Sequence, residues 1–279
     1  MRIDHRQTGP VTLDDHRRVQ NQNVQSVFSE VLNQFGRDGY ANAEPLSSDV
    51  PLESQIEQSW TDWYRVERLG RYQATEDADA LGVSFAGVLS DAYEQGGYAA
   101  PKKFLGGLDQ ESLETVQAIH GLVDPIQVNS LSEEGALNLL VPPAAQVDLN
   151  RDGITQSGIA NSIRFPDSTT SPEVTAAWDE ATEGMSWGER AIYELRMKLP
   201  VLTANFITNG DGQIVGQREP GDPDWVNPMT DPGYSYVDEA QGWIDYLDYF
   251  KNQMDPDQYA KDRSFFQSFK DKLVKHGAA

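Results

Sequence analysis

The sequence predicts a mainly α-helical protein, a multi-helix globular domain with one small β-hairpin. Three observations support this fold class. Apolar residues recur at intervals of three and four along most of the chain, as they do on one face of a helix. Many of these segments begin with a Ser, Thr or Asp cap and end at Gly or Pro. A single segment carries the turn residues and flanking pattern of a β-hairpin.

The composition limits the classes of function. The chain has 279 residues, 38% of them hydrophobic, so it can bury a sizeable core. Lys and Arg number 22 and Asp and Glu number 44, which gives a formal net charge of −22. Phosphate backbones are bound by basic faces, so we expect no nucleic-acid partner. The absence of cysteine excludes disulfides, thiolate metal sites and cysteine nucleophiles.

The expected location follows from two missing signals. No apolar run approaches the ~18 residues that a membrane span needs. The first residues, Met1 to Gln7, lack the apolar core of a Sec-type signal peptide. We therefore expect a soluble bacterial protein without a membrane span. It is expected to be cytoplasmic, or exported by a route that needs no Sec-type signal peptide.

The N-terminal part reads as a unit separate from the rest. Residues 1–12 are polar and are expected to form a loose tail. Residues 15–35 have the apolar spacing of an amphipathic helix, and residues 37–54 have the Gly, Asn, Ser and Pro content of a linker. The predicted organisation is therefore residues 1–54 as tail, helix and linker, and residues 55–279 as a mainly helical globular domain.

The helix at 15–35 has two interpretations. Its apolar stripe predicts that it docks on the body of the protein or binds another protein. Its polar face is rich in Gln and Asn, which is typical of a solvated face and compatible with a partner surface. The apolar stripe consists of Val24, Val27, Phe28, Val31, Leu32 and Phe35.

Caps and breakers locate the other expected elements. Ser186 and Glu189 have the spacing of a capping box, and Pro200 is expected to end the helix that they begin. The hairpin is expected where residues 204–208 and 213–217 flank Asn209-Gly210-Asp211-Gly212. Other helices are expected at 55–73, at 76–95, from Asp109 to His120, from a cap at Ser130 to Leu140, up to about Ile163, from Ser171, at 237–254 and at 256–275.

The strongest chemical signal is the run from Val147 to Thr155. Asp148, Asn150 and Asp152 place oxygen-bearing side chains at alternate positions, and Gly153 follows where a sharp turn is needed. This spacing lets a short loop surround a hard cation. The run resembles the Asp-x-Asn-x-Asp-Gly loops of EF-hands, dockerin-like repeats and some β-propeller repeats. The resemblance implies an EF-hand-like loop that binds Ca²⁺.

The rest of the loop agrees with this resemblance only in part. Ile154 would offer its backbone carbonyl as a ligand, and Gln156 would bind directly or through water. Ile159 stands where a bidentate Glu is expected, so the most important ligand is missing. The alternative interpretation is an Asx/Gly turn that caps the next helix. Carboxylates near in sequence that could replace the missing ligand are Glu133, Glu134 and Asp167.

Few residues point to catalysis. The sequence has no zinc-protease, nucleophile-elbow, P-loop or dinucleotide motif. His120 lies on the apolar stripe of its helix, which favours a core histidine. Most tryptophans are expected in the core, while Trp225 is either an anchor or an exposed contact. Carboxylates that could act as a hydrolase pair are Glu189 with Glu194, and Asp179, Glu180 and Glu183.

Three functional hypotheses remain. The first is a non-enzymatic, calcium-binding structural or protein-interaction protein. The second is a carboxylate-dependent hydrolase of the glycosidase or muramidase type. The third is a helical interaction protein that binds no metal.

Overall fold

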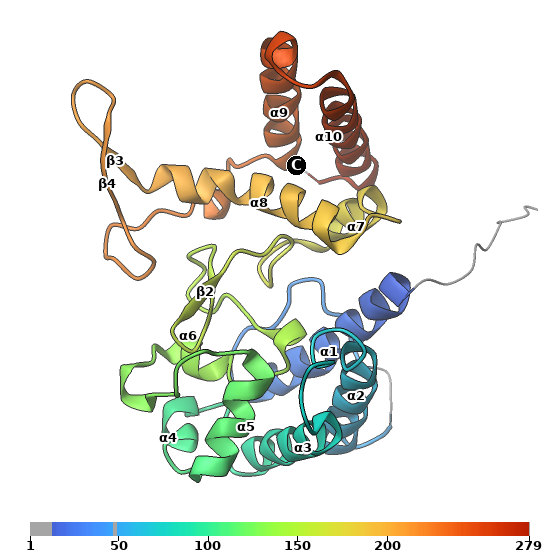
Figure 1. The fold of residues 1–279 in the computed structure, drawn as a ribbon, viewed down its shortest axis with the longest axis vertical. Helices are drawn as coiled ribbons and strands as arrows, with labels where there is room; N and C mark the ends of the chain where they lie inside the picture. The colour runs from blue at the N-terminus through green and yellow to red at the C-terminus, as the bar shows by residue number, and fades with distance from the viewer. Residues whose placement is uncertain (1–12, 47–48, 279) are drawn as a thin grey trace, which may run out of the picture. The chain divides into compact units, whose positions relative to one another are not determined.

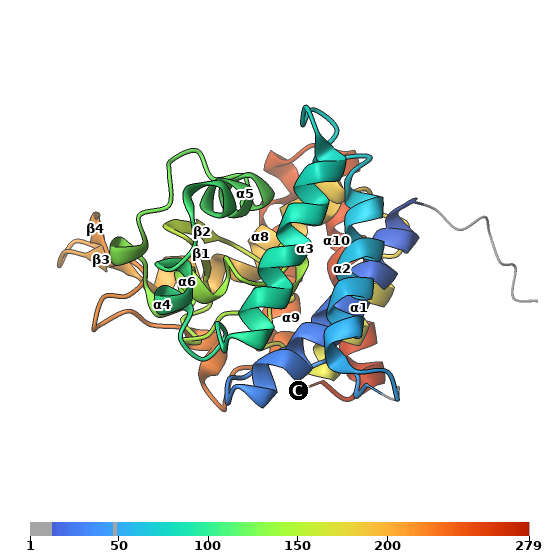
Figure 2. The same ribbon diagram turned by 90° about the horizontal axis from the view of Figure 1, so that it is seen from below.

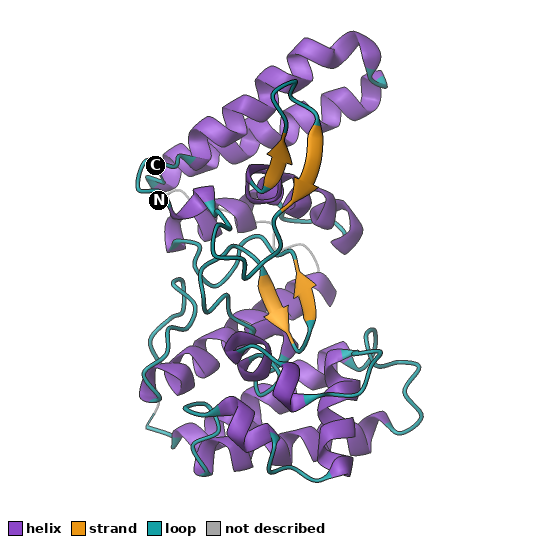
Figure 3. Ribbon diagram, turned by 90° about the vertical axis from the view of Figure 1, so that its left-hand side faces the viewer, coloured by secondary structure: helices purple, strands orange, loops and turns teal. Residues whose placement is uncertain are grey.

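The structure is a computed structural model that describes residues 13–46 and 49–278. Within these residues it contains ten α-helices and two small two-stranded antiparallel sheets (Figures 1 and 3). The prediction of a mainly helical protein is therefore confirmed. The expected tail, residues 1–12, lies outside the described residues. No helix in the described part is both long enough and apolar enough to cross a bilayer.

The chain divides into two compact units. Unit 1 contains the described residues up to Gly39 together with Glu44–Ala145, and unit 2 contains Tyr40–Ala43 together with the residues from Gln146 onward. This grouping differs from the division after residue 54 that the sequence suggested. Whether residues 55–279 fold on their own stays a prediction.

Unit 1 is built on three helices that lie side by side (Figure 2). The first helix buries Val24, Phe28 and Leu32 completely, so its apolar stripe docks inside unit 1. The second contributes Trp60 and Trp63, which stack with 5.5 Å between ring centroids and lie in the core. The helices of unit 1 are α1 (Leu13–Gln34), α2 (Leu52–Glu67), α3 (Ala78–Glu94), α4 (Pro101–Leu105), α5 (Gln110–His120) and α6 (Glu133–Leu137).

Two details of unit 1 differ from expectation. Ser132, and not Ser130, caps α6, because its hydroxyl accepts the Gly135 N–H at 2.8 Å. The helix α4 was not predicted, since five residues are too few for apolar periodicity to show. The core interpretation of His120 agrees with the structure: the ring is half-buried and its Nε2 lies 3.2 Å from the Leu139 carbonyl.

Unit 2 contains the predicted pair of C-terminal helices. They are antiparallel neighbours (Figure 1), and Trp243 stacks on Phe266 with 5.3 Å between centroids. Tyr193 stacks on Phe265 at 3.7 Å, so a third helix joins the same core. The elements of unit 2 are β1 (Thr155–Ser157), β2 (Ala160–Ser162), α7 (Pro172–Ala181), α8 (Trp187–Ala204), β3 (Phe206–Thr208), β4 (Ile214–Gln217), α9 (Tyr236–Phe250) and α10 (Pro256–His276).

The short helix expected up to Ile163 is wrong. The segment forms β1 and β2, so the described residues contain two hairpins and not one (Figure 3). Gly158 has φ +61°, a conformation that glycine adopts without strain, and it reverses the chain between the strands. Thr155 and Ser157 point to the same buried side, which is the alternation of a strand.

Pro200 does not end its helix. The helix α8 continues through Pro200 to Ala204. Proline removes one hydrogen-bond donor at a cost of about 3 kcal/mol, which tertiary packing can offset. Val201 is fully buried after the proline, and the Asn205 side chain donates to its carbonyl at 2.8 Å. The proline therefore predicted the end of this helix too early, at Pro200 instead of Ala204.

Candidate functional site

The loop after Val147 is closed by its own side chains. Asp148 accepts the N–H of Asp152 at 3.1 Å on Oδ1 and the N–H of Gly153 at 2.8 Å on Oδ2. Asn150 Oδ1 accepts the Asp152 N–H at 2.9 Å, and Asp152 Oδ1 accepts the Ile154 N–H at 2.8 Å. The alternate oxygens that the sequence singled out are thus gathered in one loop.

The backbone of this loop needs glycine at one position for two reasons. Gly153 has φ +87°, in the left-handed region that side chains other than glycine rarely adopt. A Cβ added there would lie 3.0 Å from the Asn227 side chain and 3.1 Å from that of Val201. The expected sharp turn is therefore present, and the loop packs tightly against neighbouring segments of unit 2.

A buried lysine holds the loop from α8. The Lys198 ammonium donates to the Gly153 carbonyl at 2.9 Å and to Asp167 Oδ2. Lys198 is 1% exposed and Asp167 is 4% exposed. Asp167 Oδ1 also accepts the Thr169 hydroxyl at 2.8 Å and the Thr170 hydroxyl at 3.0 Å. The loop is thereby tied to an ion pair inside unit 2.

Two buried carboxyl groups share this one ammonium. Burial raises the pKa of Asp148 to about 7, and the negative charge of Asp167 adds to the effect. Burial alone would also raise the pKa of Asp167, but Lys198 and the hydroxyl donors outweigh it and keep that pKa below its ordinary value. The interior around the loop therefore carries an excess of carboxylate over ammonium when both carboxyl groups are ionised.

A second segment of unit 2 covers the outside of the loop. Trp225 Nε1 donates to the Asp152 carbonyl at 2.8 Å, and Asn227 Nδ2 donates to the Arg151 carbonyl at 2.9 Å. Of the two roles considered for Trp225, the structure shows the anchor. Arg151 has φ +59°, and its carbonyl is held in place by Asn227. The loop is therefore fixed on both sides.

The remaining predicted ligand positions are less favourable for a metal. Gln156 lies in β1 opposite Asn161, and Ile159 is 61% exposed with no carboxylate to offer. Glu133 pairs with Arg37 in unit 1, and Asp167 is engaged by Lys198. Across residues 13–46 and 49–278, no three His, Asp or Glu side chains form a group that could hold a metal ion.

Three of the proposed catalytic carboxylates, Glu180, Glu189 and Glu194, are engaged in ion pairs. Glu189 completes the capping box of α8 and binds Lys261 at 2.6 Å. Hydrogen bonds from Lys261, and then from Ser186, lower the pKa of Glu189 to about 2. Glu194 pairs with Arg190 at 3.0 Å. These contacts are typical of surface and helix stabilisation, and they lend the hydrolase hypothesis no support.

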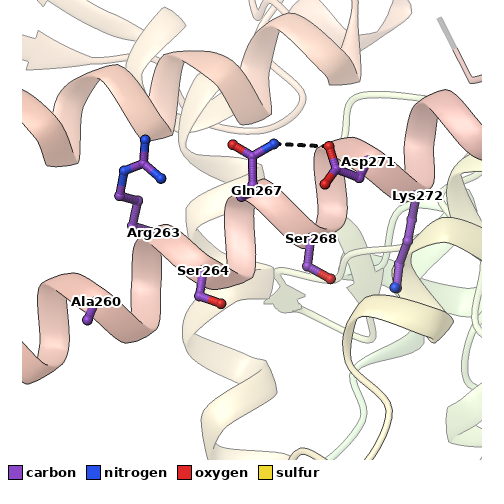
Figure 4. Close-up of a pocket in the computed structure, with 7 residues that line it drawn as sticks. All are labelled: Ala260, Arg263, Ser264, Gln267, Ser268, Asp271 and Lys272. Carbon is purple, nitrogen blue, oxygen red and sulfur yellow. Dashed lines mark hydrogen bonds between the residues drawn. The ribbon is translucent and has the colours of Figure 1, made fainter.

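Two hollows in the surface contain little reactive chemistry. One, of about 490 Å³, follows a face of α10, where Gln267 donates to Asp271 at 3.0 Å (Figure 4). Asp271 is the single carboxylate among its lining residues. The other, of about 740 Å³, lies in unit 1 beside Lys102 and Lys103 and has no carboxylate in its lining. Neither hollow therefore presents a pair of carboxylates.

Comparison with known proteins adds no relative to this description. No protein-family model matches the chain, and no curated protein or solved structure gives a significant match.

Proposed function

We propose that this chain is a non-enzymatic structural or interaction protein in which the loop at 148–154 binds Ca²⁺. The observation that supports the proposal is the charge balance around the loop. Asp148 and Asp167 are both buried, and one ammonium, that of Lys198, faces them. An isolated buried carboxylate is costly, so a divalent cation on the loop oxygens would stabilise the ionised form.

The proposed ligands are oxygens, as calcium requires. They are the side chains of Asp148, Asn150 and Asp152, the Ile154 carbonyl, and Gln156 directly or through water. The Asn150 amide and the second oxygen of Asp152 would turn from each other, where they now bond at 3.0 Å, toward the ion. Without a bidentate Glu, we expect a dissociation constant of about 10⁻⁴ to 10⁻³ M or weaker.

Calorimetric titration of the full chain with Ca²⁺ tests this proposal directly. We expect measurable heat, a weaker response to Mg²⁺, and a higher melting temperature in Ca²⁺ than in EDTA. Asp152→Ala should abolish both the heat of Ca²⁺ binding and the rise in melting temperature. Asp211→Ala is the matched control, because Asp211 also precedes a glycine in a hairpin turn but lies outside the loop. It should bind like the parent.

A second candidate is the metal-free interaction protein, and Lys198 is the observation that favours it. Its ammonium already supplies a positive charge to the loop and to Asp167. Equal melting temperatures in Ca²⁺ and EDTA, with no heat of binding, would decide for this candidate. A protein partner bound through α1 would have to use its polar face, because the apolar stripe is buried in unit 1.

A further inference from the structure

We propose that Asn209, in the turn between β3 and β4, is a site of spontaneous covalent modification. Its carboxamide is attacked by the following backbone nitrogen, which releases ammonia and forms a succinimide. Water then opens the succinimide to aspartate or isoaspartate. The hairpin that carries this turn extends from the end of α8 (Figure 1).

The turn folds the Asn209 side chain back along the chain. Asn209 Oδ1 accepts the N–H of Asp211 at 3.0 Å and the N–H of Gln213 at 2.9 Å. Since Asp211 lies two residues onward, the carboxamide is held over the intervening Gly210 peptide. The electrophilic Cγ and the Gly210 nitrogen are joined through the backbone of Asn209, so the attack is intramolecular and closes a five-membered ring.

The attacking nitrogen is accessible. Gly210 has no side chain, and a Cβ built on it would meet no atom within 4 Å. Its N–H makes no hydrogen bond among the described residues, whereas the neighbouring amides of Asp211, Gly212 and Gln213 all do. Neither a side chain nor an existing hydrogen bond therefore hinders attack by the Gly210 nitrogen.

The same turn activates the carboxamide. Two backbone N–H groups point at Asn209 Oδ1, and donors at a carbonyl oxygen stabilise the negative charge that develops there during attack. The leaving nitrogen, Nδ2, donates to Gln213 Oε1 at 3.2 Å. The arrangement resembles a minimal oxyanion hole made by the hairpin itself.

The reaction needs only water as a second reactant. The Gly210 nitrogen forms a bond to Cγ, the bond from Cγ to Nδ2 breaks, and the proton of the Gly210 N–H leaves with the ammonia. Water then adds to either carbonyl of the succinimide and restores an open chain. The new carboxylate changes the formal net charge from −22 to −22 − 1 = −23.

The two products affect the hairpin differently. Aspartate keeps the backbone and adds a charge beside Asp211. Isoaspartate routes the backbone through Cβ, directly after Thr208, whose ladder partner is Ile214. The added backbone atom would shift the pairing of β3 with β4, because register depends on turn length.

Peptide mass spectrometry on the aged, folded full chain tests the proposal. After incubation at mildly alkaline pH, the Asn209 peptide should convert first, with Asn209→Asp as the standard for one product. Asn129-Ser130 and Asn161-Ser162 are comparison sites within the same chain. We expect Asn209 to convert roughly tenfold faster or more, which corresponds to a barrier lower by about 1.4 kcal/mol.

Two controls address the role of the turn. Gly210→Ala places a methyl group beside the attacking nitrogen and should slow conversion, while its melting curve confirms that the chain still folds. A urea-unfolded sample should convert no faster than the folded one. If the folded chain kept Asn209 intact while the unfolded chain reacted, the turn would be protective and the proposal would be overturned. Equal rates for Gly210→Ala and the parent would overturn it as well.

Discussion

At the residue scale, Lys198 carries the largest predicted energetic effect. Its ammonium is buried with two acceptors, so removing it leaves Asp167 as a buried charge without its partner. We expect Lys198→Met to lower the free energy of unfolding by about 3–5 kcal/mol in urea titrations. Lys261→Met is the control, because its ion pair with Glu189 is exposed to solvent and its loss should change the free energy of unfolding far less. Similar costs for the two variants would contradict the assigned role of Lys198.

Asp148 predicts an unusual pH dependence in metal-free buffer. Its pKa in the folded protein is raised to about 7, so the folded state holds this proton more tightly than the unfolded state. Its contribution to stability is therefore full at low pH and is lost as the pH rises from about 4 to about 7. The loss is at most about 4 kcal/mol, from roughly three pKa units at 1.36 kcal/mol each.

Asp148→Asn should flatten this part of the stability profile, measured by urea unfolding at several pH values in EDTA. Calcium should oppose the loss, because metal binding requires the ionised carboxylate. The two proposals for the loop therefore differ in this experiment. If the variant and the parent lost stability in parallel over this range, Asp148 would not be the group that titrates.

Of the candidate site, the sequence predicted the contacts within the loop but not those made by residues distant in sequence. Asp148, Asn150 and Asp152 each accept a backbone N–H two to five residues onward, so the contacts of these side chains within the loop follow from local spacing. Lys198 and Trp225 could not be placed, since they lie 45 and 73 residues from the groups that they bind. One signal was present in the sequence: Lys198 is the one charged residue between Met197 and Val201, and both of these apolar residues are buried in α8.

At the scale of elements, caps gave the reliable predictions. Four of the expected helix starts have a cap whose side chain accepts a backbone N–H in the first turn, a local interaction that needs no tertiary information, whereas the cap expected at Ser130 lies at Ser132. Two larger errors, the strands at 155–162 and the continuation of α8 through Pro200, are places where packing overrides local preference. The four caps are Asp109, Ser171, Ser186 and Asp255.

Two glycines in unit 2 predict opposite effects of the same substitution. Gly153→Ala introduces a Cβ at positive φ and against Asn227, so we expect a loss of about 1–3 kcal/mol. Gly188→Ala lies in the first turn of α8 with open space around it, so we expect a gain of up to about 1 kcal/mol. Thermal unfolding of both variants measures the difference. A neutral Gly153→Ala would show that the loop is looser than described.

At the scale of the whole molecule, truncation distinguishes two ways of dividing the chain: after residue 54, or into units 1 and 2. The sequence suggested that residues 55–279 fold alone, whereas α1 packs on α2 inside unit 1. Removing residues 1–54 would expose the faces of Trp60 and Trp63 that line this core. We expect the fragment to lose the near-ultraviolet circular dichroism of these rings while unit 2 remains folded. A fragment that melts like the parent would support the division after residue 54.

A fragment of residues 146–279 is the complementary test. It contains nearly all of unit 2, so we expect a cooperative melt. It lacks Tyr40 and Ala41, which bond to Gln146 at 2.9 Å and Ser168 at 2.8 Å, so its melting temperature should be lower than that of unit 2 in the full chain. Adding residues 37–43 as a synthetic peptide should raise it. If no cooperative transition appeared even with the peptide added, unit 2 would not fold independently of unit 1.

The contacts that fix the loop at 148–154 also have a consequence for folding during translation. Unit 1 has all of its residues once Ala145 has left the ribosome, and N-terminal units commonly fold first. The Trp225 indole that anchors Asp152 is added 73 residues later. At about 5–20 residues per second, the nascent chain carries an unanchored loop for roughly 4–15 s. During that interval its carboxylates face the solvent, and cations and chaperones can reach them before unit 2 closes.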